Sequence, residues 1–307
     1  MLRLILSRLL QGVVVILVVS VLTFALLAAA GGDALTAVAN DPLVTEQTLE
    51  SLRRIYGLDR PVHVRYARWL AGVARGDLGH SFSYHAPVSG ILWPRLLNTI
   101  ILTSVALALA WAFSLGLGSW AARRAGTWVD RLCGLVILLA ASTPRIVLAL
   151  VALVFAAQTA LFSVSPTTEG GAGAPAGGAA LARLLLPALV LAVPLVALFL
   201  AQTREGVGAA LREEFVQVAR AKGLSERVVV LRHALRAALN PLITIFGYSL
   251  GGAFSGSVIV ETVLGWPGLG SLSVEAAAHR DVPLLMAVVM LTATAVLLGN
   301  LVADILL

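Results

Sequence analysis

The sequence predicts an all-α, polytopic integral membrane protein with about six transmembrane helices. Of its 307 residues, 59% are hydrophobic and 12% are charged, and the mean hydropathy is +0.94. A soluble domain carries about 25% charged residues, so these charges are too few for a water-facing surface of this size. The charges also leave six long gaps, each near or above the ~20 apolar residues that cross ~30 Å of hydrocarbon. This pattern excludes a soluble helical bundle, whose helices carry polar residues every few positions.

The gaps in charge set the order of the spans along a single transmembrane domain over residues 1–307. The spans are expected at residues 9–30, 98–122, 132–157, 184–203, 237–260 and 282–304. The first span follows Arg3 and Arg8, as the core of a signal peptide would. Its apolar run, however, is longer than the ~7–15 residues of a signal peptide's hydrophobic region. We therefore predict a retained first helix.

The third span contains a charge near its middle, Arg145, directly after Pro144. An arginine at the bilayer centre costs about 2.5–3.5 kcal/mol on insertion scales and normally faces a bundle interior or a water-filled cavity. Arg145 is therefore a candidate pathway-lining residue. The alternative is a shifted span in which its side chain snorkels to the interface. The sequence leaves both interpretations open.

Basic residues set the expected orientation of the spans. They cluster before the first span, between the second and third, and between the fourth and fifth, which all lie on one side of a six-span protein. The positive-inside rule makes that side cytoplasmic, with both termini inside. It also explains the net charge of +6 and the pI of about 10.4 better than nucleic-acid binding does. The loop at 31–97, the flexible Gly-, Ala- and Pro-rich segment Ser163–Ala180 and the connection at 261–281 are then external.

The cytoplasmic loop at 204–240 is predicted to form a helix–turn–helix element. Three- and four-residue spacing gives its first helix one apolar face, at Val207, Leu211, Phe215, Val218 and Ala219. Gly223 stands where a helix C′ glycine belongs. Ser225 can cap a second helix through Leu239, and Asn240-Pro241 then marks the start of the fifth span. The element is either an ordinary solvated connection or a docking site for a cytoplasmic partner.

The same loop resembles the EAA loop of ABC-importer permeases, in the form found in the peptide/nickel class. The matching residues are Gln217-Val218-Ala219-Arg220-Ala221-Lys222-Gly223-Leu224, continued by His233-Ala234-Leu235-Arg236 and Asn240-Pro241. Gln217 stands where the name of the loop expects Glu, and Val218 stands where it expects Ala.

Three further blocks resemble the same family, in order and at its spacing. They lie after the first helix, at the start of the second, and between the fifth and sixth. Their residues are Gly57-Leu58-Asp59-Arg60-Pro61, Tyr66, Arg68-Trp69-Leu70 and Gly76-Asp77-Leu78-Gly79; then Arg95-Leu96-Leu97-Asn98-Thr99; then 260–270 with Arg280-Asp281-Val282-Pro283. Over nearly its whole length, the chain is similar to the first permease subunit of dipeptide/oligopeptide/nickel ABC importers.

The resemblance implies the MetI-like fold of binding-protein-dependent ABC permeases and import of di- or oligopeptides by alternating access. One alternative is the same transporter class carrying nickel or another chelated metal. A second is a membrane scaffold or signalling protein without transport. The implied partners are a second homologous permease, two cytoplasmic ATPase subunits, an external substrate-binding protein and membrane lipid. Because no G-x-x-x-x-G-K-[ST] phosphate loop occurs here, we expect ATP and Mg²⁺ in the partner subunits, and no catalytic, cofactor or metal site in this chain.

The resemblance also implies two sets of functional residues. The coupling loop to the ATPase would comprise Phe215, Gln217, Val218, Ala219, Arg220, Ala221, Lys222, Gly223 and Leu224. The pathway or gate is expected at Arg145, Gly251, Ser255, Glu261, Trp266, Pro267, Arg280 and Asp281. The turn cluster Gly265-Trp266-Pro267-Gly268 would lie at the outer mouth near the gate, or would be a re-entrant turn anchored by an interfacial Trp266.

The fifth span contains glycine patterns with two possible meanings. Gly247-Tyr248-Ser249-Leu250-Gly251 matches the G-x-S-x-G motif of hydrolases, but it lies inside an apolar helix without a histidine partner, which argues against catalysis. The pairs Gly247/Gly251 and Gly252/Gly256 also have the spacing that lets helices approach closely in lipid. They serve either packing within the chain or a sliding face next to the partner permease.

Overall fold

The protein is all-helical over the residues that the computed structural model describes, which are 2–29, 47, 50–51, 59–159 and 178–306. The expected loop Ser163–Ala180 lies outside this range up to residue 177, as do most of residues 31–58, including Gly57 and Leu58. The helices are α1 (Leu2–Ala29), α4 (Val62–Ala74), α5 (Val88–Arg123), α6 (Trp128–Ser142), α7 (Arg145–Thr159), α8 (Gly178–Ala210), α9 (Glu214–Ala221), α10 (Glu226–Val228), the π-helical turn η1 (Val229–Ala234), α11 (Leu235–Leu264), α12 (Leu269–Ala278) and α13 (Val282–Leu306).

The number of spans agrees with the expected architecture. Five helices are long and apolar enough to cross a membrane. A sixth span is formed when α6 and α7 are counted together as one broken span. The protein is therefore a multi-pass membrane protein with five to six transmembrane helices.

The third expected span, at 132–157, is divided between α6 and α7, which meet at an angle of 99°. The break falls at Thr143-Pro144, where Thr143 is extended (φ −86°, ψ 120°). A residue before proline is pushed out of the helical region by the proline ring, which explains why α6 ends there. Pro144 directly precedes the new helix, and its carbonyl accepts hydrogen bonds from the N–H groups of Val147 and Leu148 in the first turn. Arg145 is the first residue of α7.

The chain forms two compact units, which we describe separately. Unit 1 comprises Met1–Thr99 and Pro267–Leu297, and unit 2 comprises Ile100–Trp266 and Leu298–Leu307. Their boundaries fall inside the continuous helices α5 and α13 and in the turn after α11.

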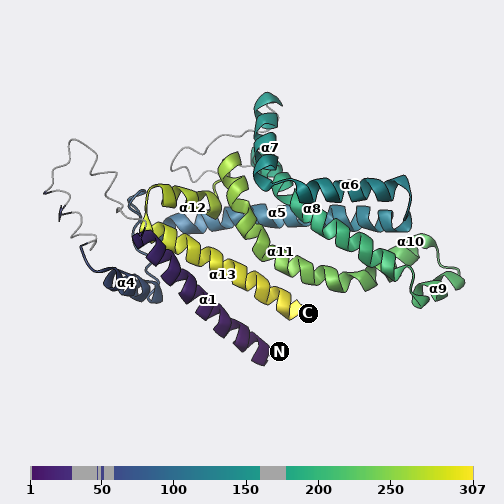
Figure 1. Cartoon of the computed structure of the whole chain (residues 1–307), viewed down its shortest axis with the longest axis horizontal. Helices are drawn as coiled ribbons and strands as arrows, with labels where there is room; N and C mark the ends of the chain where they lie inside the picture. Colours follow the sequence, from purple (N-terminus) through teal and green to yellow (C-terminus); the bar gives the residue numbers. More distant parts are fainter. Residues whose placement is uncertain (1, 30–46, 48–49, 52–58, 160–177, 307) are drawn as a thin grey trace. The chain divides into compact units, whose positions relative to one another are not determined.

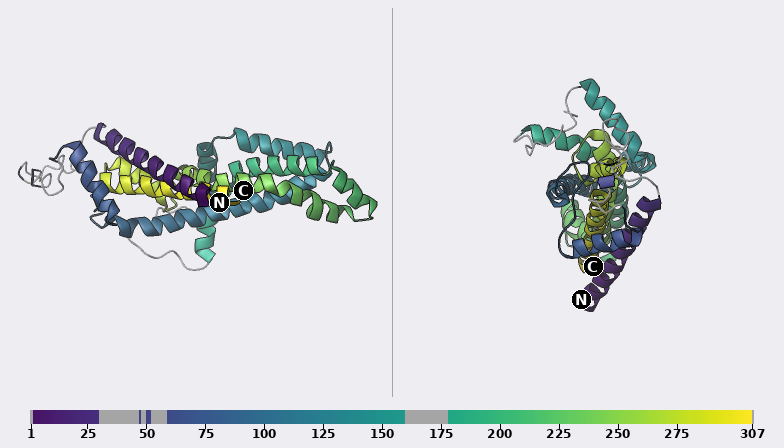
Figure 2. Two further views of the ribbon diagram at one scale, coloured as in Figure 1. Left: turned by 90° about the horizontal axis from the view of Figure 1, so that it is seen from below. Right: turned by 90° about the vertical axis from the view of Figure 1, so that its left-hand side faces the viewer.

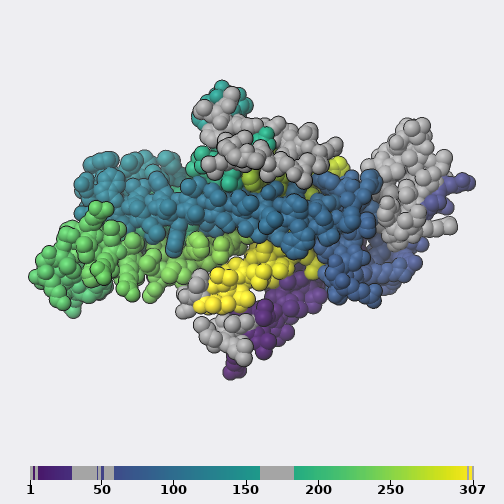
Figure 3. All heavy atoms as spheres, turned by 180° about the vertical axis from the view of Figure 1, so that it is seen from behind, coloured from purple at the N-terminus to yellow at the C-terminus, as the bar shows by residue number. Residues whose placement is uncertain are grey.

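In unit 1, α1 lies alongside α13 (Figures 1 and 2). They meet at Gly12, where an added Cβ would stand at the ordinary contact distance of 3.6 Å from Leu297 Cδ1. The outer side of α1 carries large exposed apolar side chains, and Figure 3 shows it uncovered in purple beside α13 in yellow. An apolar helix with so little of its surface buried is suited to contact with lipid.

A second contact of α1 is with α4 in the segment before α5. Tyr66 of α4 shares a 2.8 Å hydrogen bond with the hydroxyl of Ser20, and its ring packs edge-on against Phe24 at 5.4 Å. The remaining core of unit 1 lies between the start of α5, α12 and the start of α13. It is formed by Val88, Leu92, Leu269, Leu272, Ala276, Leu284, Ala287 and Val288.

In unit 2, α8 packs against both α6 and α11, and α7 crosses α11 and α8 (Figure 1). The core is built from small and medium apolar residues of α5, α7, α8 and α11, with Phe199 fully buried among them. Small residues let these helices approach closely: an added Cβ on Gly118 of α5 would lie 2.8 Å from Thr203 Cβ of α8. Packing of this kind is how helices associate in lipid, where apolar burial gives little driving force.

The expected second helix of the 204–240 loop does not end at Leu239. Instead, the chain is helical without a break from α10 through η1 to the end of α11, and Pro241 lies inside α11. The expectation that the second helix ends at Leu239 was therefore wrong. A proline removes a single helical hydrogen bond, and membrane helices tolerate this where local π-type turns and neighbouring groups compensate. The π turn η1 lies just before it, and α8 likewise contains Pro187 and Pro194.

Candidate functional site

The predicted coupling loop forms a short helix whose phase differs from the expected one. α8 ends at Ala210, and α9 begins at Glu214 after Glu213, which is extended (φ −72°, ψ 151°). This turn interrupts the helical repeat that the apolar spacing assumed. Val216 and Ala219 consequently face inward, whereas Phe215 and Val218, which were expected to share one apolar face with Ala219, are exposed.

A small core holds α9 in place. Val216 (0% exposed), Ala219 and Val229 pack together, with Leu211 at their edge. The helix ends as the sequence predicted, because Gly223 has a positive φ of 76° and its N–H donates to the carbonyl of Arg220 at 2.9 Å. Glycine adopts this left-handed conformation without the steric cost that other residues meet. Ser225 precedes α10 as predicted, but its side chain makes no capping hydrogen bond.

The outer face of this element is apolar and unusually exposed for such large side chains. Phe215 is 45% exposed and Val218 53%, and Leu224, Val228 and Leu231 are exposed beside them in the sequence. The Arg220 guanidinium donates to Glu226 at 2.6 Å, and both side chains are largely in solvent. Such a pair contributes about 0–1 kcal/mol, so its main effect is to orient the turn between α9 and α10. Gln217, Ala221 and Lys222 are also exposed. We call the exposed set Phe215, Val218, Leu224, Val228 and Leu231 the α9 patch.

Arg145 packs directly on α11. An added Cβ at Gly256 would stand 2.2 Å from the Nη1 atom of Arg145 and 2.7 Å from its Cζ atom. The guanidinium therefore occupies the space that any side chain at position 256 would need. Small residues continue this interface, because Ala149 and Ala156 of α7 and Ala253 of α11 are buried in the same cluster.

The other expected pathway residues of unit 2 do not gather around Arg145. Gly251 lies against α13, since an added Cβ on Gly299 would stand 3.3 Å from the Gly251 N atom. Ser255 is exposed, and Glu261 is fully buried. Trp266 packs against the core of unit 2, and its N–H donates to the Glu261 carbonyl at 2.9 Å. Of the second glycine pair, Gly256 is covered by Arg145 and Gly252 has no heavy atom within 4 Å of an added Cβ, so the two do not form one interface within the chain.

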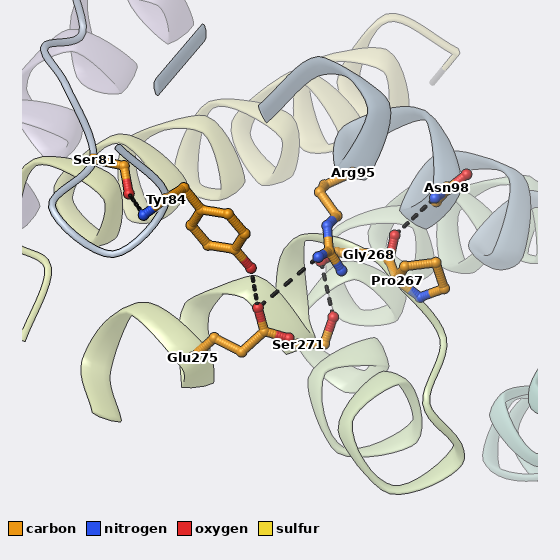
Figure 4. Close-up of polar contacts among 8 residues, drawn as sticks. All are labelled: Ser81, Tyr84, Arg95, Asn98, Pro267, Gly268, Ser271 and Glu275. Carbon is orange, nitrogen blue, oxygen red and sulfur yellow. Dashed lines mark hydrogen bonds and ion pairs between the residues drawn. The ribbon is translucent and has the colours of Figure 1, made fainter. Parts of the chain in front are cut away.

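The remaining expected gate residues, Pro267, Arg280 and Asp281, lie in unit 1. The carbonyl of Pro267 accepts a 2.7 Å hydrogen bond from the side-chain amide of Asn98 (Figure 4). Arg280 is exposed and has a positive φ of 54°. Asp281 is fully buried and accepts hydrogen bonds from the Ser81 hydroxyl and from the backbone N–H groups of Ser83 and Leu284.

A polar cluster that the sequence did not indicate accompanies them. The Tyr84 hydroxyl donates to Glu275 Oε2 at 2.6 Å, and Arg95 approaches the same oxygen at 3.9 Å (Figure 4). Burial, followed by the hydrogen bond and charge of Glu275, raises the pKa of Tyr84 to about 12. These residues come from the loop before α5, from α5 itself and from α12, so no local spacing links them. The sequence offered one signal in this region: Asp281 directly precedes α13, and an acidic residue in that position is a common N-cap.

A second missed interaction joins α6 to α8. The Arg204 guanidinium donates to Asp130 Oδ1 at 2.5 Å, and the other oxygen of Asp130 accepts from the Gly126 N–H at 3.0 Å. Asp130 lies in the first turn of α6, where an acidic side chain also interacts favourably with the helix dipole. The sequence assigned Arg204 only to the basic loop after the fourth span.

Comparison with known families covers almost the whole chain. Residues 114–307 match the family described as “Binding-protein-dependent transport system inner membrane component”. Residues 1–103 match the family described as “Binding-prot-dependent transport system membrane comp, N-term”. The two matches together include all the sequence blocks that resemble this family. Residues 57–79 and 95–99 lie in the second match, and residues 217–241, 260–270 and 280–283 lie in the first.

Individual relatives are similar over the same extent. The oligopeptide transport system permease protein AppB of Bacillus subtilis is 34% identical, over 98% of this chain and 96% of its own length. The glutathione transport system permease protein GsiC of Salmonella typhimurium is also 34% identical, over 100% of this chain and 96% of its own. GsiC of Escherichia coli O6:H1 is 33% identical with the same coverage.

Proposed function

Because this chain belongs to the binding-protein-dependent transport system inner membrane components, as a permease subunit of a peptide-type ABC importer, we propose that it imports peptides by alternating access. The family is a multi-pass component of the inner membrane that has no catalytic role itself and works with ATPase and binding-protein partners. We infer that ATP hydrolysis takes place in those partners and that this chain binds no cofactor.

The proposed assembly pairs this chain with a second, homologous permease, two cytoplasmic ATPase subunits and an external binding protein. In the proposed orientation both termini are cytoplasmic. The positive-inside rule supports this, because the basic segments 123–131 and 204–236 then share one side.

The observation that carries the proposal is the α9 patch. A short helix such as α9 rarely exposes large apolar side chains such as Phe215 and Val218 together unless a partner covers them. The inner side of α9 is fixed by Val216 and Ala219, and α9 packs against η1, which continues directly into α11. We propose that an ATPase subunit covers the α9 patch and that its movement is transmitted through η1 to α11.

Coupling of this kind requires that the partner discriminate between two states. ATP binding can shift the permease only by the difference in its affinity for the inward-open and outward-open forms. Within unit 2, we propose that Gly251, Ser255, Glu261 and Trp266 contribute to the pathway. For unit 1, we propose separately that Pro267, Arg280 and Asp281 contribute to a gate. The small residues of α11 support the role in the pathway, because helices with small side chains can slide without being locked by packing.

The names of the relatives favour peptides over a chelated metal as cargo. AppB is named for oligopeptides, and GsiC is named for glutathione, which is itself a tripeptide.

Site-specific crosslinking tests the coupling proposal. A single cysteine replaces Phe215 in the assembled importer, with Cys133→Ser as background, and a thiol-reactive crosslinker is added. We expect crosslinking to an ATPase subunit from Phe215→Cys and not from Val216→Cys, because Val216 is buried inside the element. Scrambling residues 219–223 should abolish uptake of peptide. Uptake that persists after scrambling, or equal crosslinking at the two positions, would contradict the proposal.

A further inference from the structure

Arg145 is a cation placed within an otherwise uncharged part of the chain. No charged residue lies between it and Arg131, nor between it and Glu169. Arg131 lies in the first turn of α6 and Ser142 ends it, so the end of α6 lies about 17 Å along the helix from Arg131, and Arg145 follows directly after Thr143-Pro144. This is well inside a hydrocarbon core about 30 Å thick.

The guanidinium is positioned by its packing rather than by a counter-charge. It lies over Gly256 on α11 and is partly buried. Among the described residues, none makes a hydrogen bond or ion pair with it. The nearest acidic residue on the same helix, Glu261, follows Gly256 by five residues, which places it about 140° away around α11.

A cation at this depth is retained in membrane proteins where it faces water or binds an anion. Arginine is suited to a carboxylate, because its planar group donates two parallel hydrogen bonds to the two carboxylate oxygens. Every unmodified peptide carries one such group, its C-terminal carboxylate, whatever its side chains are. A site for that group would therefore accept many peptide sequences.

We propose that the Arg145 guanidinium, seated on Gly256, binds the carboxylate of a peptide during its passage through the membrane. This inference rests on the proposed function as a peptide permease and assigns a specificity residue to it. Gly256 is the positioning residue, because any side chain there displaces the guanidinium. Since the displaced atoms are the end of a flexible side chain, Gly256→Ala moves the charge at little cost to the fold.

The test compares two forms of one peptide that has no acidic side chain, with a free C-terminus and with a C-terminal amide. The complete importer is reconstituted in proteoliposomes, each peptide is supplied at a concentration that saturates the binding protein, and initial uptake is measured. The informative quantity is the ratio of variant to wild-type uptake for each peptide. The preference of the binding protein is the same in both and cancels from this ratio.

We expect Arg145→Gln to lower uptake of the free peptide about tenfold or more, as the loss of a charge-assisted hydrogen bond does. Uptake of the amide should change less than about twofold. Arg145→Lys should retain part of the activity, because it keeps the charge but loses the two parallel hydrogen bonds. Gly256→Ala should resemble Arg145→Gln in direction. The matched control is Gly134→Ala in α6, where an added Cβ meets no atom within 4 Å and uptake of both peptides should be unchanged.

Two results overturn the inference. An equal fall for both peptides assigns Arg145 to folding, gating or a lipid phosphate, and unchanged uptake in both Arg145 variants leaves it without a role. Failure of the proposed function looks different, because the wild-type importer itself would then take up neither peptide in the presence of ATP.

Discussion

The carboxylate of Asp281 accepts a 2.6 Å hydrogen bond from the hydroxyl of Ser81, although the two residues are 200 positions apart in the chain. Both side chains are buried. The same carboxylate accepts from the N–H of Leu284 in the first turn of α13 and from the N–H of Ser83. One residue therefore caps α13 and fixes the loop that leads into α5.

Ser81→Ala is expected to destabilise unit 1. It leaves one oxygen of a fully buried carboxylate with one donor fewer, which costs about 1–3 kcal/mol of the free energy of unfolding. Thermal unfolding of the purified chain in detergent measures this as a lowered midpoint. Ser83→Ala is the matched control: only its backbone N–H contacts Asp281, so the midpoint should stay unchanged. Equal midpoints for the two variants would show that the hydroxyl contributes nothing.

Gly118→Ala is expected to loosen the contact between α5 and α8 in unit 2. The added Cβ would stand 2.8 Å from Thr203 Cβ and 3.2 Å from the backbone N of Arg204. Thr203 is β-branched and has few rotamers to escape into, and the Arg204 backbone cannot move alone. We expect a loss of about 1–3 kcal/mol in the free energy of unfolding, the usual cost of overpacking.

The control for this prediction is Gly116→Ala, one half-turn away on the same helix. No atom lies within 4 Å of its added Cβ, so the helix-stabilising effect of alanine should be the main change. Denaturation in detergent with increasing denaturant compares the two variants. A Gly118→Ala variant as stable as Gly116→Ala contradicts the close approach.

The membrane spans could be predicted from the sequence because the hydrocarbon core imposes a length and excludes charge. Both constraints act on each segment alone, so they are visible without the tertiary structure. The position of the break also follows from the sequence, because a proline keeps the residue before it out of the helical conformation. The 99° angle between α6 and α7 does not, because packing of α7 on α8 and α11 sets it.

The functional details depend on a turn and on a long-range contact, and neither can be read from local sequence spacing. A turn of three residues before Glu214 shifts the helical phase of α9, so Phe215 and Val218 do not share a face with Ala219 as the apolar spacing predicted. The Tyr84–Glu275 contact joins residues 191 apart. By contrast, Gly223 was predicted correctly because a helix C-terminus is a local feature.

The hydroxyl of Tyr84 should titrate late, with a pKa near 12 rather than the usual 10.0. Burial and the Glu275 carboxylate both favour its neutral form, so Glu275→Gln should move the pKa back towards 10.0. As the pH rises from 10, the unfolded chain releases this proton first. The contribution to stability is therefore present below pH 10 and is lost as the pH rises through 12.

Ultraviolet absorbance of tyrosinate measures this titration, and the difference between the wild type and Tyr84→Phe isolates the signal of Tyr84. Glu226→Gln serves as the control, because its carboxylate pairs with Arg220 in unit 2. If the Glu275 and Glu226 variants give the same curve, Glu275 does not influence the Tyr84 hydroxyl.

Substitutions at two nearby valines of α9, Val216 and Val218, should separate effects on the folding of this element from effects on its proposed coupling role. Val216 is fully buried and Val218 is 53% exposed, two positions further along the same helix. Val216→Ser removes apolar burial and places a hydroxyl in the small core, so α9 should become sensitive to protease and lose about 1.5–3 kcal/mol of local stability. Val218→Ser should leave protease resistance unchanged, because surface substitutions usually stay within about 0.5 kcal/mol.

The two variants should then differ in the reason for which transport fails. Val218→Ser is expected to weaken retention of the ATPase subunits during purification and to lower ATP-driven uptake, since it places a polar group in the α9 patch. In the Val216→Ser variant the same losses should accompany cleavage within residues 211–225. Wild-type uptake and ATPase retention in Val218→Ser would mean that this face of α9 is not the ATPase contact. If Val218→Ser alone has no effect because a single exposed apolar side chain needs no partner, the double variant Phe215→Ser/Val218→Ser still tests the contact. It removes two members of the α9 patch while the core around Val216 stays intact.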